Sequence, residues 1–202
     1  DIQIVLDTVV NLDLIRSLQP DYLIVATGSV PRSLMLDDST PHEHVVQAIE
    51  VLTTRESLTG DVVIVGGGLV GLDVAEVLST TADRVTIIEK GSRVGSVLEW
   101  NLRKMRLASL RHYGVNMMLQ SQLIRCERSA VMVCNPSGDE ERIQADVLVL
   151  ALGSVPDNPL PQLAEALSCP QTFIGDCRNP AGLTEALSQG RSAGRMSISH
   201  NA

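Results

Sequence analysis

Three glycines and one carboxylate have the types and spacing needed to hold the diphosphate and ribose of a dinucleotide. Gly66, Gly68 and Gly71 form a G-x-G-x-x-G pattern, and Glu89 follows 18 residues after Gly71. The first glycine permits a tight turn, the second lets the backbone approach a pyrophosphate, and the third lets a helix pack closely on a strand. A carboxylate about 20 residues further on accepts hydrogen bonds from both ribose hydroxyls. The predicted site comprises Gly66, Gly67, Gly68, Leu69, Val70, Gly71, Glu89 and Lys90.

The segments around this pattern are those that a dinucleotide site requires. The β-branched run 62–65 enters the glycines, a helix-patterned segment follows, and a second apolar run, 85–88, ends on Glu89. Strand, glycine turn, helix, strand and acid therefore occur in the required order. Two alternatives stay open at this point: a βαβ unit whose glycines serve only a tight turn, and a site for S-adenosylmethionine, whose ribose also suits this carboxylate.

The charge of Glu89 favours NADH over NADPH, because it would repel a 2′-phosphate and bind a free diol. Lys90 and Arg93 follow closely and would accommodate the phosphate if the loop turned them inward. We therefore expect NAD(H) to be preferred over NADP(H).

A second motif occurs twice, at an offset of 125 residues. Segments 21–31 and 146–156 share the pattern D-x-L-x-x-A-x-G-S-V-P, in which an apolar strand runs into a glycine turn. The extended segments 2–6 and 115–119, upstream of each copy, also correspond. Two copies of one supersecondary plan predict two dinucleotide-type domains, one nested in the other. The second copy has its own glycine pattern, whereas that of the first would precede the chain's first residue.

A helix and a β-meander are predicted between the second apolar run and the second motif. Ser96 and Glu99 form a capping box that opens a helix, and Gly114 ends it. Segment 122–144 predicts a β-meander with a turn at 135–138. In the helix we expect Leu102, Met105, Ala108 and Leu110 to face the core, and Arg103, Lys104, Arg106 and Arg111 to lie on a solvated face.

Composition argues against several classes of partner. The net charge of −8, without a dense basic cluster, and only four aromatic residues argue against nucleic acid. The longest apolar run is too short for a bilayer. The four cysteines form no C-x-x-C pair, and we expect reduced thiols, no metal site, solvated His42 and His44, and a cytoplasmic protein. The chain starts without methionine and is expected to be part of a longer polypeptide.

Three features together point to a family: the glycine pattern, the twin A-T-G and A-L-G turns, and Ile174-Gly175-Asp176 ahead of a helix that contains T-E-A-L. With them the chain resembles the C-terminal region of the NADH:flavin oxidoreductases that carry an old-yellow-enzyme-like barrel. That group includes 2,4-dienoyl-CoA reductase, enoate reductase and trimethylamine dehydrogenase. The resemblance covers essentially all 202 residues. The lack of C-x-x-C separates the chain from thioredoxin reductases, and its end soon after Asp176 separates it from glutathione-reductase-like enzymes.

The resemblance implies an α/β fold: a Rossmann-like, three-layer dinucleotide-binding domain with a parallel sheet and a β-meander, inserted in a truncated FAD-type domain. The expected divisions are 1–36 and 154–202 for the two segments of the FAD-type domain, 37–60 for a linker, and 61–153 for the NAD(P)H-binding domain. An N-terminal barrel of the same polypeptide would hold FMN and an iron–sulfur cluster, and a homo-oligomer is compatible with this plan.

The resemblance also implies FAD-binding residues. Ala26, Thr27 and Gly28 would lie beside FAD, with Gly153 at the equivalent position of the second copy. Gly175 and Asp176 would contact the ribityl and pyrophosphate portion, and the helix starting at Leu183 would point toward the isoalloxazine. Asp176 has an alternative role as a cap for the following loop.

By resemblance, the intact enzyme would pass a hydride from NADH to FAD, and electrons onward to FMN and an enoyl-type substrate. No side chain needs to act as an acid or base in that step, so we predict no catalytic residue, and the isolated chain is expected to be inactive. Two other functions remain open: a non-catalytic module that holds ADP, as in trimethylamine-dehydrogenase-like proteins, and a reductase completed by a partner chain.

Overall fold

The computed structural model describes residues 2–34, 44–54, 57–157 and 167–200. The chain divides into two compact units. Unit 1 comprises Asp1–Val30 and Ser154–Ala202, and unit 2 comprises Pro31–Gly153. The glycine pattern and Glu89 belong to unit 2.

Unit 2 is built on a five-stranded parallel sheet with the strand order β3-β10-β4-β5-β6. The strands are β3 (Val45–Gln47), β10 (Val147–Leu150), β4 (Asp61–Val65), β5 (Arg84–Glu89) and β6 (Asn116–Leu119). Four consecutive residues of β4 are buried. Both faces of the sheet are covered at this strand, which explains its continuous apolar run in place of an alternating pattern.

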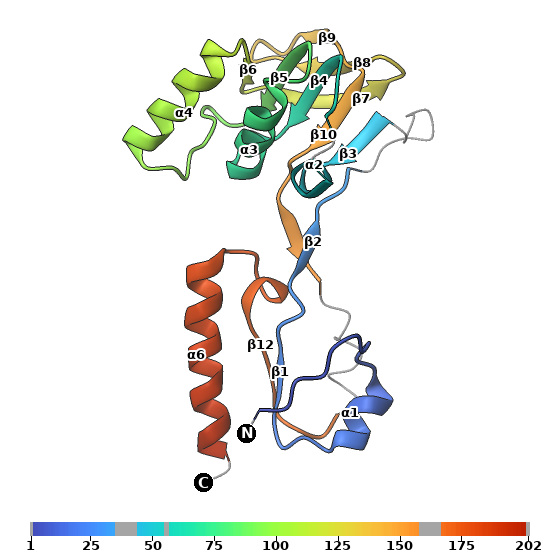
Figure 1. Cartoon of the computed structure of the whole chain (residues 1–202), viewed down its shortest axis with the longest axis vertical. Helices are drawn as coiled ribbons and strands as arrows, with labels where there is room; N and C mark the ends of the chain where they lie inside the picture. Colours follow the sequence, from blue (N-terminus) through green and yellow to red (C-terminus); the bar gives the residue numbers. More distant parts are fainter. Residues whose placement is uncertain (1, 35–43, 55–56, 158–166, 201–202) are drawn as a thin grey trace. The chain divides into compact units, whose positions relative to one another are not determined.

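Helices cover one face of this sheet, and an antiparallel meander covers the other (Figure 1). The helices are α2 (Ala48–Thr54), α3 (Leu69–Leu78) and α4 (Trp100–His112), and the meander consists of β7 (Gln122–Glu127), β8 (Ala130–Cys134) and β9 (Glu140–Gln144). Within β4, Val62 and Ile64 pack with the helices, whereas Val63 and Val65 pack with the meander. The three layers confirm the predicted Rossmann-like α/β class.

Elements β3 and α2 lie in segment 37–60, which the sequence analysis assigned to a linker. Strand β3 pairs with β10, and α2 buries Ala48 and Val51 in the helix-side core. The apolar residues of 45–52 explain this, because they give the segment a face to bury. The described part of the segment therefore adds a strand and a helix to unit 2, while the functional division of the chain into domains stays a prediction.

Helix α4 begins later than predicted. Glu99, and not Ser96, is its N-cap: the Glu99 carboxylate accepts hydrogen bonds from the backbone N–H groups of Asn101 at 2.8 Å and Leu102 at 3.2 Å. A carboxylate at this position also suits the positive end of the helix dipole. The end of the helix agrees better with the prediction than its start does. Tyr113 is the C-cap, and Gly114 follows with a φ of 77°.

The core-facing side of α4 also differs from the prediction. Leu107 and Leu110 are buried, whereas Leu102, Met105 and Ala108 are exposed. The prediction was therefore wrong for three of its four residues. Apolar residues occur on two sides of this helix, so helical periodicity alone does not decide which side meets the sheet.

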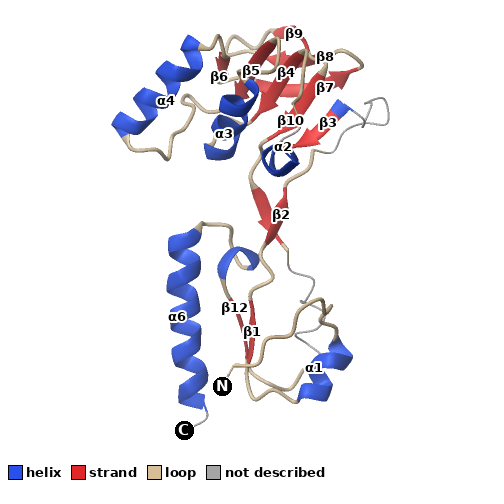
Figure 2. Ribbon diagram, in the orientation of Figure 1, coloured by secondary structure: helices blue, strands red, loops and turns tan. Residues whose placement is uncertain are grey.

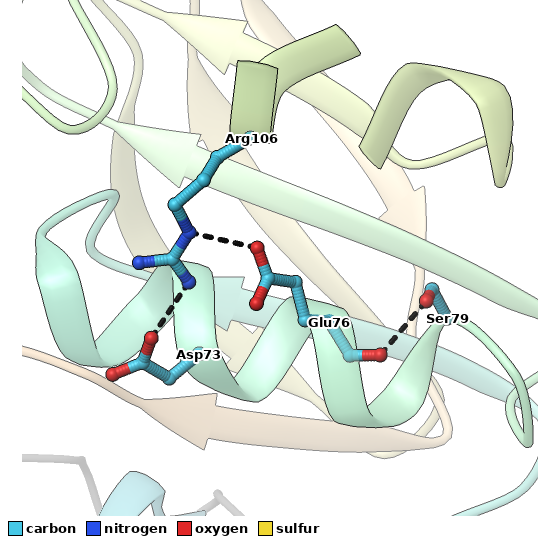
Figure 3. Close-up of polar contacts among 4 residues, drawn as sticks. All are labelled: Asp73, Glu76, Ser79 and Arg106. Carbon is cyan, nitrogen blue, oxygen red and sulfur yellow. Dashed lines mark hydrogen bonds and ion pairs between the residues drawn. The ribbon is translucent and has the colours of Figure 1, made fainter. Parts of the chain in front are cut away.

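Arg106 links α4 to α3 (Figure 3). Its Nε lies 2.7 Å from Oε1 of Glu76, and its Nη2 lies 2.6 Å from Oδ1 of Asp73. The Arg106 side chain is only 18% exposed, so the predicted solvated position is wrong for this residue. The hydrogen bond that Arg106 donates to Glu76 is the main cause that raises the pKa of Arg106, and the guanidinium stays charged throughout the neutral range.

Unit 1 contains a two-stranded parallel sheet of β1 (Leu23–Val25) and β12 (Gln171–Phe173), which lie side by side in Figure 2. It also contains α1 (Leu12–Leu18), the short 3₁₀ helix η2 (Gly175–Cys177) and α6 (Leu183–His200). Val25 and Cys177 form its small core with Leu23 and Phe173. The extended segment 2–6 does not form the strand that its weak alternation allowed: these residues are exposed and pair with no strand of the described chain.

The two copies of the repeated motif have related local structures. Each copy ends its strand, β1 or β10, before a glycine in the left-handed region, with φ values of 85° at Gly28 and 77° at Gly153. The following strands, β2 (Ser29–Pro31) and β11 (Ser154–Pro156), pair with each other. The N–H of Arg32 donates to the carbonyl of Gly153 at 2.9 Å, and the N–H of Asp157 donates to that of Gly28 at 3.0 Å. The repeat therefore recurs in backbone conformation as well as in sequence.

Replacing Arg106 with Met is expected to lower the free energy of unfolding by about 1–2 kcal/mol, because two charge-assisted hydrogen bonds are lost while the apolar stem is kept. Urea denaturation of the chain measures this change. Lys104→Met is the matched control, since it removes an exposed cation of the same helix and should change stability by less than about 0.5 kcal/mol. Equal effects of the two substitutions would contradict the linking role of Arg106.

Candidate functional site

A cleft of about 630 Å³ lies at the carboxyl ends of three neighbouring strands in unit 2. Gly66 follows β4, Glu89 ends β5, and Ala151 follows β10. Strand β4 lies between the other two in the sheet. Open parallel α/β sheets bind ligands at this edge, because loops that leave neighbouring strands diverge there. The cleft is therefore where a ligand-binding site is expected in such a fold.

The first and third glycines of the pattern are required by close backbone packing. Gly66 has a φ of 111°, and a Cβ added to it would lie 2.3 Å from the carbonyl oxygen of Ala151. A Cβ on Gly71 would lie 1.9 Å from the carbonyl oxygen of Gly66. Real Cβ atoms are not found at such distances from backbone, so these two positions fix how α3 and β10 approach the turn after β4.

The second glycine is surrounded by open space. Gly68 lines the cleft, and a Cβ added to it would meet nothing within 4 Å. It is the N-cap of α3, and no side chain caps this helix. Within the described residues, no acceptor contacts the N–H groups of Leu69 and Val70. The start of α3 therefore offers free amide donors and the positive end of a helix dipole, a combination that suits a phosphate group.

The Glu89 carboxylate is held by two backbone amides. Its Oε2 accepts a hydrogen bond from the N–H of Gly67 at 2.7 Å, and its Oε1 accepts one from the N–H of Gly91 at 2.6 Å. Glu89 thus ties the glycine loop to the turn that follows β5, a role that sequence reasoning missed. Each oxygen keeps a second lone pair that can accept a hydroxyl hydrogen bond at the cleft.

Two cationic side chains lie at the cleft. Lys90 lines it, as does Arg32, which the sequence analysis did not select. Both are exposed, and no carboxylate of the described residues pairs with either. Arg93 is exposed but does not line the cleft. One of the two cations considered for a 2′-phosphate is therefore at the site, and the other is not.

The remaining cleft residues were mostly not predicted. Gly153 is the one among them that the sequence analysis selected. The others are Leu34, Val65, Ile88, Ser121, Gln122, Leu123, Ala151 and Leu152. Most of them end or closely follow a strand of the parallel sheet, and this is the signal that would have found them. Ser121, just beyond β6, is buried; its hydroxyl donates to the carbonyl of Leu119 at 2.9 Å, and its N–H donates to that of Glu89 at 3.0 Å. Gly67, Leu69, Val70 and Gly71 do not line the cleft.

The residues that the resemblance implies for FAD lie in unit 1. The hydroxyl of Ser29 lies 3.4 Å from Oδ2 of Asp176, which places Ala26-Thr27-Gly28 close to Gly175-Asp176. Thr27 Oγ1 donates to the carbonyl of Asp157 at 2.5 Å. The structure thus brings together two segments that are far apart in the sequence.

Gly175 and Asp176 also have structural roles. Gly175 has a φ of 66°, and its N–H donates to Oε1 of Gln189 in α6 at 2.7 Å. Oδ1 of Asp176 accepts a hydrogen bond from the N–H of Ala181 at 3.2 Å. Asp176 therefore caps the following loop, the alternative considered from the sequence, while its role toward FAD stays a prediction.

Other expectations concern membranes, metals and thiols. In the part of the chain that the structure describes, no helix is long and apolar enough to cross a membrane. The same residues contain no group of three or more His, Cys, Asp or Glu side chains placed to hold a metal ion. The four cysteines are free thiols. His42 lies outside the described residues.

The three-layer fold and the cleft at its strand ends define a dinucleotide-binding α/β protein. The chain belongs to the pyridine nucleotide-disulphide oxidoreductase family, which its residues 4–186 match. It is 30% identical over 184 residues to the NADH oxidase of Thermoanaerobacter brockii; this covers 89% of the chain and 28% of that protein. Membership of this family supports binding of a pyridine nucleotide and FAD, and oxidoreductase chemistry in general.

Solved structures share the fold. A 2-naphthoyl-CoA reductase aligns with a TM-score of 0.79 at 24% identity, over 94% of this chain and 29% of that one. The histamine dehydrogenase of Rhizobium sp. 4-9 aligns with a TM-score of 0.78 at 19% identity, over 93% of this chain and 32% of that one. The chain therefore spans less than a third of the length of each of these three proteins.

Two glycine substitutions should separate folding from the site. Gly71→Ala is expected to cost about 3 kcal/mol or more of stability, because its Cβ overlaps a backbone oxygen that cannot move without distorting the turn. Gly68→Ala should leave stability within about 0.5 kcal/mol, because its Cβ enters open space at a negative φ. Thermal unfolding of both variants checks this. Similar losses of stability in both would show that the second glycine is also needed for packing.

Proposed function

We propose that the unit 2 cleft binds NADH, and that the chain is the nucleotide-binding part of an NADH:flavin oxidoreductase. One observation carries the proposal: a single cleft is lined by Gly68, the N-cap at which α3 begins with free amides, and by the Glu89 carboxylate at the end of the next strand. A dinucleotide has an anionic diphosphate next to a ribose diol. The two kinds of group in the cleft match these two parts in charge and in order.

The strand order suggests the direction in which the nucleotide lies. Glu89 ends β5, Gly68 follows β4, and Gly153 follows β10, and these strands are neighbours in the sheet. Adenosine ribose at Glu89 and diphosphate at Gly68 would direct the nicotinamide toward Gly153 and Arg32. In this orientation Arg32 adds a cation on the nicotinamide side of the diphosphate.

The clamped carboxylate supports the preference for NADH. Two backbone amides hold Glu89 in place, so it cannot swing away from a 2′-phosphate without leaving them unpaired. Of the two cations that closely follow Glu89 in the sequence, Lys90 and Arg93, only Lys90 lines the cleft. We infer that repulsion by Glu89 outweighs attraction by Lys90, and that NADPH binds more weakly than NADH.

When bound, NADH supplies a hydride and FAD accepts it, and this chemistry belongs to the cofactors. The residues of this chain bind and orient. In unit 1 the left-handed glycines Gly28 and Gly175 and the carboxylate of Asp176 would shape the FAD site. No side chain of the chain is assigned an acid or base role. Onward electron transfer to FMN, through an iron–sulfur cluster in a barrel of the same polypeptide, is part of this proposal.

Glu89→Gln should test the nucleotide preference. The substitution keeps an oxygen for one backbone amide but removes the charge, so NADH affinity should fall about tenfold. The preference for NADH over NADPH should shrink as well, because the repulsion is gone. Calorimetric titration with both nucleotides measures this, and Glu141→Gln, an exposed residue of β9, is the matched control. An unchanged ratio of the two affinities would contradict the role of Glu89.

A second candidate function is a nucleotide-holding module through which no hydride passes. The chain aligns almost as well with histamine dehydrogenase, whose name describes an amine-oxidising enzyme, as with the reductase. This observation supports the second candidate. The two candidates differ in how the flavin is reduced. We expect that adding NADH under anaerobic conditions to the purified flavin-loaded protein will bleach the flavin absorbance. Bleaching by an amine such as histamine, and not by NADH, would establish the holding module instead.

A further inference from the structure

We propose that a second cleft of unit 2, between α4 and β6, binds a small dicarboxylate, and that this ligand strengthens NADH binding. The cleft has a volume of about 270 Å³. It is separate from the cleft at Glu89, with which it shares no lining residue. The binding part of this proposal stands alone, and the effect on NADH rests on the proposed function.

The walls of the cleft follow from the periods of its two elements. Arg103, Leu107 and Arg111 occur four residues apart on α4, so they form one stripe along the helix. On the other wall, Met117 and Leu119 alternate along β6 and point to the same side of the sheet. The cleft therefore has an apolar middle. Arg103 and Arg111, at the two ends of the helical stripe, each contribute a guanidinium group to its lining.

The two arginines are not paired with acids. No carboxylate of the described residues forms an ion pair with Arg103 or Arg111, and none lines the cleft. The contrast with Arg106 on the same helix is clear, since that residue contacts Asp73 and Glu76 (Figure 3). Guanidinium groups that line a cleft without a carboxylate partner keep N–H donors available for an anion. Such a pair is conspicuous in a chain with a net charge of −8.

The spacing of the two arginines indicates the shape of the ligand. Eight residues of helix separate their Cα atoms by about 12 Å along the axis. Leu107 lies between them, so an anionic group at each end of an apolar chain would match the wall. Guanidinium groups bind carboxylates through paired hydrogen bonds. The volume lies just below the usual range for sites of drug-sized ligands, about 300–1,000 Å³, which favours a small dicarboxylate over a nucleotide.

A short hydrogen-bonded path connects this cleft to the glycine loop. Nε of Arg103 donates to the carbonyl of Val94 at 2.6 Å, and the N–H of Gly95 donates to the carbonyl of Gly67 at 2.7 Å. Gly67 in turn donates its N–H to Glu89. A dicarboxylate that holds the outer nitrogens of Arg103 would stiffen segment 94–95, and with it the loop at which NADH is proposed to bind. A second ligand binds more tightly to a loop that is already ordered.

Suberate is the probe for the binding site, in calorimetric titrations of the 202-residue chain. Octanoate has the same chain length with one carboxylate, and should bind about tenfold more weakly. Arg111→Leu, at an exposed position, should reduce suberate affinity to the octanoate level. Lys104→Gln, which removes a cation of α4 that does not line the cleft, should leave it unchanged. Equal affinities for suberate and octanoate, equal effects of the two substitutions, or tighter binding of an acidic peptide than of suberate would each overturn the dicarboxylate site.

The effect on NADH is tested by repeating the NADH titration with saturating suberate. We expect NADH affinity to rise about fivefold, and suberate affinity to rise by the same factor when NADH is present. Arg111→Leu should abolish both increases while leaving NADH affinity without suberate unchanged. Suberate binding with no change in NADH affinity would overturn the coupling alone. Suberate binding in a chain that binds no NADH under any condition would overturn the proposed function and leave the dicarboxylate site standing.

Discussion

The close approach of three backbone segments at Gly66 is the constraint on which unit 2 depends. The carbonyl of Ala151 leaves no room for a side chain at Gly66, and the carbonyl of Gly66 leaves none at Gly71. Because β10, β4 and α3 are held this near to one another, the start of α3 opens directly onto the ends of the central strands. The free amides there have no acceptor within the described residues, and this supports the proposal that an anion binds at the cleft.

A second layer of polar contacts holds the rim of the cleft. Glu89 joins the glycine loop to Gly91, and Gly95 joins the same loop from the other side through the carbonyl of Gly67. Arg106 fixes α3 against α4 from the outer face of the helices. The loop is therefore held by several hydrogen bonds, and each contact that orders it further reduces the ordering cost of binding.

The sequence predicted the parts of this protein that depend on local pattern. The glycine spacing, the β-branched run of β4 and the turn at 135–138 each require particular residue types, so the central βαβ unit and the meander could be located. The repeat at 21–31 and 146–156 likewise recurs as strand and left-handed glycine. Where several patterns are compatible, prediction failed: α4 has apolar residues on two sides, and only the sheet selects Leu107 and Leu110. Residues such as Arg32 and Ser121 reach the cleft through tertiary contacts, which spacing in the sequence does not reveal.

The double hydrogen bond of Glu89 limits how this site can evolve. A change of nucleotide preference is usually pictured as the exchange of one acidic side chain for a neutral or basic one. In this chain such an exchange would also leave at least one of the Gly67 and Gly91 amides without its acceptor, and a buried donor left unpaired costs about 1–3 kcal/mol. A lineage that moved from NADH to NADPH would therefore need a compensating acceptor nearby, before or together with the change at position 89. The conformation of the glycine loop and the charge at position 89 are thus coupled through these two hydrogen bonds.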